Sequence, residues 1–262
     1  MTRALFLGAG ASPGVPSLSC GFGCCNPDNP KNVRTRTSTI YEIGGKRILV
    51  DVSPDLRTQF LQNDIKYLDG ILITHAHFDH IGGIDELREI NRINHKPIDV
   101  YTPDYVIKAL KKRYAYMIMN NDSKQVSYEN KGGIVIHTIK PNHEFYMCGI
   151  KVMPLKLLGH NVPSCGYIIN DEIVHLGDFK VLASSATQRI ALIKPKLMVF
   201  PLTIVYEHRY HLGLEDVLCY IKQFKPERVV LNHMASECDY DFVNDHTPQN
   251  TQPAFDNLEL KW

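Results

Sequence analysis

Residues 74–80 read THAHFDH and directly follow an apolar, strand-like run. Three imidazoles and one carboxylate therefore fall within six residues. These are side chains that bind transition metals and other divalent ions. Because alternate side chains of an extended backbone point the same way, His75 and His77 can bind one ion. Asp79 and His80 follow where the chain must turn, so they can reach a second ion beside the first.

A histidine-rich surface turn is the alternative interpretation of residues 74–80. The stretch opens onto Gly82-Gly83 at the end of an apolar run, and loops at strand ends are where catalytic and binding residues gather. Imidazole suits zinc, iron, nickel and manganese, and carboxylate suits the harder ions of that group. We therefore favour a site for two metal ions.

The composition is that of an ordinary globular protein. The chain has 262 residues, of which 44% are hydrophobic and 22% are charged. This length fits one large domain or two small ones. Since no linker-like stretch divides the chain, we expect a single domain over residues 1–262. The net charge is only +1, with Lys+Arg 29 against Asp+Glu 28, which does not favour a large basic surface for nucleic acid.

No targeting or membrane segment is recognisable in the sequence. The run Ala4-Leu5-Phe6-Leu7 is too short for the core of a signal peptide, and no stretch approaches the length of a membrane span. We therefore expect a cytoplasmic protein. The seven cysteines are an odd number, which argues against a disulfide framework.

Strand-like and helical segments follow one another along the whole chain. Pro54 with Asp55 in the first turn is a helix start signal, and Gly44-Gly45 between two strand-like runs predicts a tight hairpin turn. The order predicts mixed sheets covered by helices. The expected strands span 3–7, 37–43, 47–50, 70–74, 133–139, 150–157, 166–170, 173–176, 197–200 and 228–231, and the expected helices span 54–63, 83–95, 103–119, 184–193, 213–224 and 237–244.

Residues 75–80 match the HxHxDH motif of the metallo-β-lactamase superfamily in every position. The chain resembles that superfamily over most of its length. The resemblance implies an α/β (α+β) fold. This is a four-layer αβ/βα sandwich in which two mixed sheets are flanked by helices, with the metals at one edge between the sheets.

The resemblance also indicates where the remaining ligands lie. His160, Asp178 and His233 each follow a strand-like run, as the superfamily pattern requires. Asp51, at the end of another such run, matches a carboxylate that orients a ligand imidazole, although a turn residue is the alternative. The implied sets are His75, His77 and His160 for the first ion, Asp79, His80 and His233 for the second, and Asp178 as the bridge.

This ligand set implies metal-assisted hydrolysis, with Asp79 and Asp178 contributing as ligands. The pKa of a water between two divalent ions can fall from 15.7 to about 7, which supplies a metal-bridging hydroxide. We expect manganese or zinc, with iron as an alternative, because mixed histidine and carboxylate sites accept several metals.

Two further histidines precede the helical pattern at 213–224. In phosphodiesterase branches of the superfamily, a histidine at the position of His211 faces the substrate phosphate and protonates the leaving group. An ordinary imidazole titrates near neutrality, as that task requires. His208 lies close enough in sequence to bind the substrate with His211. The alternative is that His211 caps or packs against the helix.

The N-terminal segment narrows the resemblance to one branch. Residues 7–16 read LGAGASPGVP and are similar to the opening of a branch that includes the PhnP-type phosphoribosyl cyclic phosphodiesterases. Residues 29–38, 51–57 and 83–88 resemble the same branch. It implies a small cyclic-phosphate or nucleotide-like substrate and, by resemblance only, a homodimer.

The same segment contains a G-x-S-x-G pattern centred on Ser12. A serine nucleophile in that motif needs an oxyanion donor from the backbone N–H of the next residue. Pro13 has no N–H, so a nucleophilic Ser12 is excluded. A glycine-rich turn near the substrate phosphate is the remaining functional interpretation.

A cluster of cysteines departs from the branch pattern. The branch carries C-x-C-x-x-C and a later histidine, which together hold a structural zinc. Cys20 and Cys25 match the outer cysteines, but Cys24 is displaced from the middle position and Ser236 stands where the histidine belongs. The alternatives are an altered zinc site of Cys20, Cys24 and Cys25, with Cys238 as a further ligand, and reduced cysteines packed in a loop.

Three other functions compete with a phosphodiesterase. An RNA-processing nuclease of the same fold needs a large basic surface or an RNA-gripping arm, and the sequence offers neither. A glyoxalase-type thioester hydrolase needs neither the GVP segment nor His211. A non-catalytic metal-binding scaffold is disfavoured by the complete ligand set. We therefore expect a small phosphorylated or nucleotide-like substrate and no membrane partner, and we disfavour nucleic acid as a partner.

Overall fold

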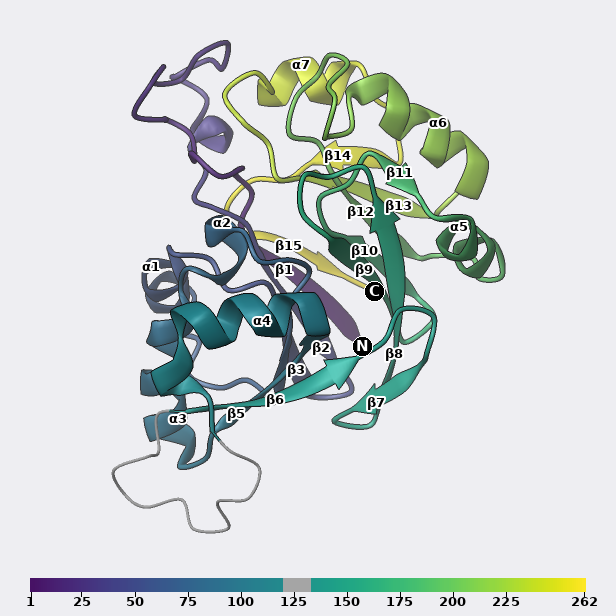
Figure 1. Ribbon diagram of the computed structural model, residues 1–262. Coiled ribbons are helices and arrows are strands. Elements are labelled where there is room, and N and C mark those ends of the chain that lie inside the picture. The colour runs from purple at the N-terminus through teal and green to yellow at the C-terminus, as the bar shows by residue number, and fades with distance from the viewer. Residues whose placement is uncertain (120–132) are drawn as a thin grey trace.

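The computed structural model describes residues 1–119 and 133–262. Among these residues, the first sheet has seven strands. The strands from the two ends of the chain, β1 and β15, pair within it (Figure 1). The neighbouring strands β3, β4, β5 and β6 pair with one another in parallel. The remaining neighbours in this sheet pair antiparallel. In spatial order the strands are β15 (Leu258–Lys261), β1 (Thr2–Gly8), β2 (Ser38–Ile43), β3 (Lys46–Val50), β4 (Gly70–Leu72), β5 (Ile98–Pro103) and β6 (Ile134–Ile139).

The second sheet has eight strands in the same described part of the chain. It is also mixed, because β10, β12, β13 and β14 pair in parallel while β8, β9 and β10 are antiparallel. The strand β7 (Phe145–Met147) pairs with β8 beside the main path. In spatial order the others are β11 (Val181–Leu182), β8 (Ile150–Leu158), β9 (Ser164–Ile169), β10 (Ile173–Leu176), β12 (Leu197–Pro201), β13 (Arg228–Asn232) and β14 (Thr251–Pro253).

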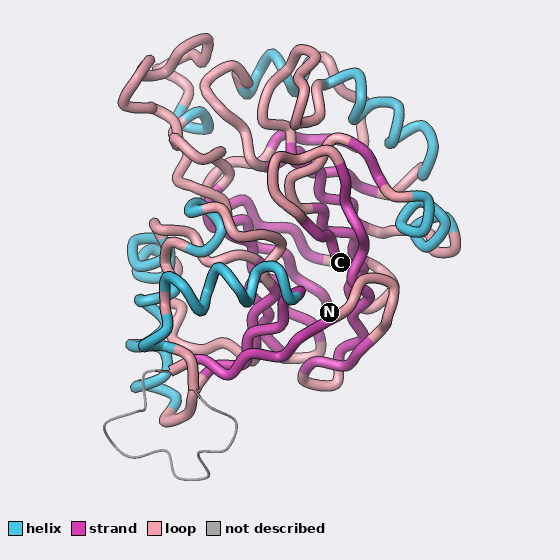
Figure 2. The backbone as a smooth tube through the Cα atoms, in the orientation of Figure 1, coloured by secondary structure: helices cyan, strands magenta, loops and turns pink. Residues whose placement is uncertain are grey.

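Helices flank both sheets, which lie together in the middle of the molecule (Figure 2). The predicted sandwich of two mixed sheets flanked by helices is therefore confirmed. No helix in the described ranges is long and apolar enough to cross a bilayer. On the side of the first sheet lie α1 (Leu56–Gln62), α3 (Leu87–Asn94) and α4 (Asp104–Arg113), on the side of the second lie α5 (Ser184–Ala191), α6 (Leu214–Phe224) and α7 (Tyr240–Asp245), and the short elements are α2 (Phe78–Ile81), η1 (Pro30–Asn32), η2 (Ile84–Glu86) and η3 (Ala115–Met117).

Apolar side chains from both sheets form one continuous core. Phe6 and Tyr41 from the first sheet and Tyr167 from the second are fully buried in it. The burial and close packing of these apolar side chains hold the two sheets against each other. A polar pair crosses the core, where the Tyr41 hydroxyl and Nδ1 of His175 share a hydrogen bond at 2.8 Å. Burial lowers the pKa of His175 to about 4, so the ring is neutral at pH 7.

One expected helix is too long. The helix predicted over 103–119 ends at Arg113, and η3 follows after Tyr114 leaves the helical conformation at φ −128°. Lys111, Lys112 and Arg113 occupy the last turn of α4. Positive side chains at that place interact favourably with the free carbonyl end of a helix, which favours termination there.

Candidate metal centre

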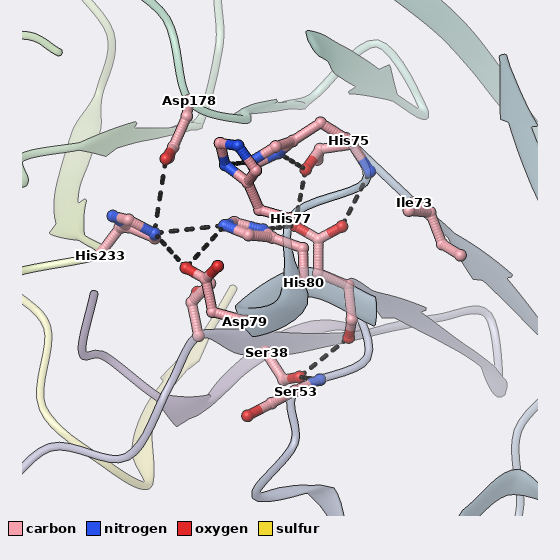
Figure 3. A network of polar contacts seen from close by, with 12 residues as sticks. Ser38, Ser53, Ile73, His75, His77, Asp79, His80, Asp178 and His233 are labelled. Carbon is pink, nitrogen blue, oxygen red and sulfur yellow. Dashed lines mark hydrogen bonds and ion pairs between the residues drawn. The ribbon is translucent and has the colours of Figure 1, made fainter. Parts of the chain in front are cut away.

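Strand ends meet at one edge between the two sheets and deliver the side chains of the candidate site. Asp51 follows β3, the THAHFDH stretch follows β4, His160 follows β8, Asp178 follows β10 and His233 follows β13. Figure 3 shows side chains from several of these segments turned toward one another. The structure thus brings all seven predicted ligands together, in overlapping groups that could each hold a metal ion.

The backbone is unusual where two of these side chains leave their strands. Asp51 has φ 61° and His233 has φ 58°. Both are in the left-handed region, which residues other than glycine rarely occupy and which costs about 1–3 kcal/mol. Gly159, directly before His160, has φ 83°. Such a backbone conformation ends the extended strand at the point where the site residue stands.

The first group of ligand atoms consists of three ring nitrogens. Nε2 of His75 lies 3.1 Å from Nδ1 of His77, and Nε2 of His160 lies 3.2 Å from the same Nδ1. A tetrahedral zinc ion with Zn–N bonds of about 2.0–2.1 Å separates its nitrogens by about 3.3–3.4 Å. Lone pairs that face one another this closely repel unless a cation lies among them. The spacing therefore fits a metal ion.

The second group contains Asp79, His80 and His233. Oδ2 of Asp79 lies 3.3 Å from Nε2 of His80 and 3.1 Å from Nε2 of His233, and the two Nε2 atoms are 3.2 Å apart. All three side chains are almost fully buried. A buried carboxylate together with two imidazoles is a donor set that transition metals accept.

Asp178 lies between the two groups. Its Oδ2 is 4.0 Å from Nε2 of His160 in the first group and 3.5 Å from Nε2 of His233 in the second. Its Oδ1 is buried and has no hydrogen-bond partner among the described residues. Although burial opposes ionisation, the charges of His233 and His80 hold the pKa of Asp178 well below its usual range. An ionised, unsatisfied oxygen is explained by a bound cation.

The protonation of the histidines also suits metal binding. Burial lowers the pKa of His75 well below its usual value, and it lowers the pKa of His77 and of His160 as well. Neutral rings are the form that ligates metals. Burial opposes charge on His80 too, but nearby carboxylates, Asp79 first, raise its pKa well above the usual value. The carboxylates of the second group therefore stabilise a positive charge beside them, as a bound cation would supply.

Outer partners hold the ligand rings. In four ligand histidines Nε2 faces the cluster and Nδ1 contacts an oxygen atom of a neighbouring residue. Such contacts fix the orientation and the tautomer of the ring. The Nδ1 pairs are His75 with the Thr74 hydroxyl at 3.0 Å, His80 with Oδ2 of Asp51 at 2.7 Å, His160 with the Tyr210 carbonyl at 3.3 Å, and His233 with the Thr203 hydroxyl at 3.1 Å.

Sequence reasoning missed the two threonines in this outer layer. Thr74 stands directly before His75 in the quoted stretch, and that position was a usable signal. Thr203 follows β12 and meets His233 only in the folded chain, so no local pattern marks it.

A cleft of about 300 Å³ opens beside the ligands. Its wall includes Ser12 and Pro13 from the glycine-rich turn. Phe78, whose side chain is exposed, also lines it. The described lining residues are Ala11, Ser12, Pro13, His77, Phe78, Asp79, His160, Asn161, Asp178, Thr203, His211, His233 and Ala235.

His211 lies on the cleft wall against the ligands. Its Nδ1 is 3.2 Å from Oγ1 of Thr203 and 3.7 Å from Oδ2 of Asp178. Burial lowers the pKa of His211 to about 4, so the expectation of a ring that titrates near neutrality is wrong. A neutral imidazole at pH 7 has one N–H donor and one acceptor nitrogen.

His208 is absent from the described residues that line the cleft. Its Nδ1 accepts a hydrogen bond from the backbone N–H of Tyr210 at 3.3 Å, and its ring centroid is 5.2 Å from that of His211. These contacts organise the loop itself. The geometry therefore does not support the substrate-binding role predicted for His208.

The cysteine cluster does not converge on a common point. Among the described residues, Cys20, Cys24 and Cys25 form no group whose sulfur atoms could share one ion. Sγ of Cys20 lies 3.2 Å from the Ser236 hydroxyl, and Sγ of Cys25 donates to the Ser236 carbonyl at 3.4 Å. Hydrogen bonds to the serine thus occupy the place that a histidine ligand would take, and the geometry does not support a structural zinc.

One known protein family matches most of this chain. The family model described as "Beta-lactamase superfamily domain" matches residues 46–234. The octanoyltransferase of Porphyromonas gingivalis is 34% identical over 236 residues, which are 89% of this chain and 46% of that protein. The chain spans about half the length of the curated relatives it matches.

Solved structures share the whole fold. A diphosphatase from the PhnP family has a TM-score of 0.88 and 23% identity, covering 100% of this chain and 98% of that chain. Zn²⁺-bound PqqB from Methylobacterium extorquens has a TM-score of 0.78 and 18% identity, covering 99% of this chain and 100% of that chain. At these identities the likeness establishes a common architecture.

Proposed function

The chain belongs to the metallo-β-lactamase superfamily, and from that premise we propose that it is a dinuclear metal-dependent hydrolase of a small phosphodiester. The substrate class is cyclic-phosphate or nucleotide-like. The observation that carries the proposal is the position of Asp178, whose carboxylate lies between two groups of ligand atoms at one cleft.

Each group of ligand residues would hold one ion. Asp178, which lies between the groups, would bind both ions. When bound, two divalent ions lower the pKa of a water to about 7 and polarise the bond under attack. The residues themselves supply a rigid, largely buried cage. Outer partners such as Asp51 and Thr74 prevent the ligand rings from turning, so little reorganisation is needed during the reaction.

His211 is proposed to donate a hydrogen bond to the leaving oxygen. The ring is on the cleft wall, close to Asp178, and a neutral imidazole can still donate through its one N–H. A donor aimed at developing negative charge contributes about 100-fold or more to turnover. This role replaces that of a charged general acid.

The cleft favours a small substrate over RNA. Among the described residues that line it, none is lysine or arginine. Proteins that bind RNA or DNA draw most of their affinity from such side chains, which neutralise backbone phosphates. A single phosphodiester can instead be held by the cations and by the polar side chains of Ser12 and Asn161.

Phosphate chemistry agrees with the diphosphatase of the PhnP family as a fold neighbour. The octanoyltransferase relative is about twice as long as the matched region, so we do not propose acyl transfer for this chain. A thioester hydrolase of the glyoxalase type stays an alternative, because the same ligands would serve it.

The proposal is tested with a panel of substrates and three variants. Protein purified with Mn²⁺ or Zn²⁺ should hydrolyse a p-nitrophenyl phosphodiester and a cyclic nucleotide, with little activity on a glutathione thioester or on a tRNA precursor. Asp178→Ala should lose metal and activity together. His211→Ala should keep its metal while kcat for the cyclic nucleotide falls about 100-fold.

His143→Ala is the matched control, because His143 is exposed and its ring contacts only the Pro141 carbonyl among the described residues. It should behave like the unmodified protein. A preference for the thioester, or activity that survives complete removal of metal by a chelator, would contradict the proposed function.

A further inference from the structure

The backbone fixes Thr203 beside the second ligand group. Residue 203 follows β12, which runs parallel to β13, the strand that leads into His233. The N–H of Leu202 donates to the Asn232 carbonyl at 2.8 Å, and the N–H of Ala235 donates to the Thr203 carbonyl at 3.2 Å. With hydrogen bonds on both sides, the hydroxyl of Thr203 has a defined position.

That hydroxyl contacts two histidines. Oγ1 of Thr203 lies 3.1 Å from Nδ1 of His233 and 3.2 Å from Nδ1 of His211. A hydroxyl has one hydrogen and two acceptor lone pairs. It can therefore donate to one of these rings and accept from the other, but it cannot donate to both.

The direction of the two hydrogen bonds follows from His233. Nε2 of this ring faces the cluster, 3.1 Å from Oδ2 of Asp79 and 3.5 Å from Oδ2 of Asp178. A neutral imidazole that ligates through Nε2 carries its hydrogen on Nδ1. Nδ1–H of His233 therefore donates to Thr203, and the threonine hydrogen is left for Nδ1 of His211.

We propose that Thr203 is a positioning residue that sets the tautomer of His211, so that this ring presents Nε2–H to the substrate. Nδ1 of His211 accepts from the threonine, and a neutral ring must then hold its hydrogen on Nε2. Nε2 has no hydrogen-bond partner among the described residues, and the ring lines the cleft. The benefit of this tautomer rests on the proposed phosphodiesterase function, whereas the tautomer itself rests only on His233 binding a metal ion through Nε2.

Without the hydroxyl, the opposite tautomer is expected. Oδ2 of Asp178 lies 3.7 Å from Nδ1 of His211, and a carboxylate at that distance attracts a hydrogen on Nδ1. Nε2 would then turn an acceptor lone pair to the cleft, where it would repel the oxygens of a phosphate.

Thr74 provides an internal comparison. Its hydroxyl also lies against Nδ1 of a ligand histidine, His75, at 3.0 Å. However, it donates its hydrogen to Oδ2 of Asp51 at 2.8 Å, a carboxylate that is buried behind the site. The hydrogen of Thr203 instead reaches a histidine on the cleft wall, so of these two threonines Thr203 is the one that links a ligand ring to the cleft.

Nitrogen NMR reads the tautomer directly. In Zn²⁺-saturated protein labelled with ¹⁵N at histidine, long-range ¹H–¹⁵N correlations distinguish Nδ1–H from Nε2–H, and His211→Ala assigns the signals. The unmodified protein and Thr203→Ser should show Nε2–H for His211. Thr203→Val should show Nδ1–H or a mixture. Thr187 lies on helix α5, and its hydroxyl donates to the carbonyl of Ala183, directly before that helix. Thr187→Val should therefore leave the spectrum of His211 unchanged.

Kinetics test the consequence for catalysis. Thr203→Val should lower kcat about 10–100-fold for a diester with a poor alkyl leaving group and much less for p-nitrophenolate, which needs little help to leave. Thr203→Ser should restore the rate. Metal content is measured for each variant, so that a loss of ligand is recognised.

Two results would overturn the inference: His211 as Nδ1–H in the unmodified protein, or unchanged Nε2–H in Thr203→Val. If Thr203→Val shifts the tautomer while no phosphodiester is cleaved by any form, the assignment of Thr203 stands and the proposed function fails.

Discussion

Asp51 shows how much one residue outside the ligand set can organise. Its Oδ1 accepts from the backbone N–H of Thr74 at 2.8 Å. Its Oδ2 accepts from the Thr74 hydroxyl at 2.8 Å and from Nδ1 of His80 at 2.7 Å. Through these bonds one carboxylate orients His80 directly and His75 by way of Thr74. It therefore supports ligands of both proposed ions.

Replacing this carboxylate tests that role. Asp51→Asn puts an NH₂ group at one of the two acceptor positions. Either the backbone N–H of Thr74 at Oδ1 loses its acceptor, or the Thr74 hydroxyl and the N–H of His80 at Oδ2 both do. We expect metal affinity to fall about 10–100-fold, measured by competition with a chelator of known affinity.

Asp99→Asn is the matched control for this substitution. Asp99 also pairs with a histidine, His137, at 2.7 Å, but on the surface of the molecule. Its metal affinity should equal that of the unmodified protein. Equal affinity in Asp51→Asn as well would mean that the carboxylate does not support the metal ligands.

At the scale of elements, backbone hydrogen bonds join the short helix α2 and the residues after it to the loop after β3. The N–H of Val52 donates to the His80 carbonyl at 2.8 Å, and the N–H of Gly83 donates to the Val52 carbonyl at 3.0 Å. A Cβ on Gly83 would lie 2.0 Å from the Ser53 carbonyl oxygen. The close approach of these segments, which sets Asp51 against His80, thus depends on a glycine.

A methyl group at this contact should push the segments apart. Gly83→Ala should destabilise the protein by about 1–3 kcal/mol and weaken metal binding, because α2 carries Asp79 and His80. Denaturant unfolding without metal and chelator competition measure the two effects. Since Gly83 has φ −91°, backbone strain makes no contribution.

Gly45→Ala separates stability from metal binding. At Gly45 a Cβ would meet no atom within 4 Å, but φ is 78°, so alanine is strained there by about 1–2 kcal/mol. This variant should lose stability and keep its metal affinity. If Gly83→Ala also kept full metal affinity, the contact between α2 and the loop would not position the ligands.

The elements also show what local sequence can predict. The hairpin at Gly44-Gly45 was predicted from its turn residues, and the observed β2–β3 pair confirms it. The strands β5, β7, β11, β14 and β15 were missed. β14 and β15 are short strands, and β15 exists because it pairs with β1, from the other end of the chain. β5 directly precedes α4, and the expected helix over 103–119 overlaps it only at Pro103.

For the whole molecule, the sequence predicted the architecture and the set of side chains that meet between the sheets. It succeeded because the THAHFDH stretch has a fixed internal spacing and because the superfamily resemblance indicated which strand ends carry the other ligands. The roles of Thr203, His208 and Ser236 could not be predicted, because each depends on which loops meet after folding. The neutral state of His211 likewise results from burial, which local sequence does not reveal.

The central claim is that two sheets bring two groups of ligands to one carboxylate. The most direct measurement is an anomalous difference map from crystals of the Zn²⁺-loaded protein. It should show two peaks, about 3.5–4 Å apart, one among His75, His77 and His160 and one among Asp79, His80 and His233, with Asp178 between them. A single peak, or zinc bound only elsewhere such as at the cysteine loop, would contradict the account.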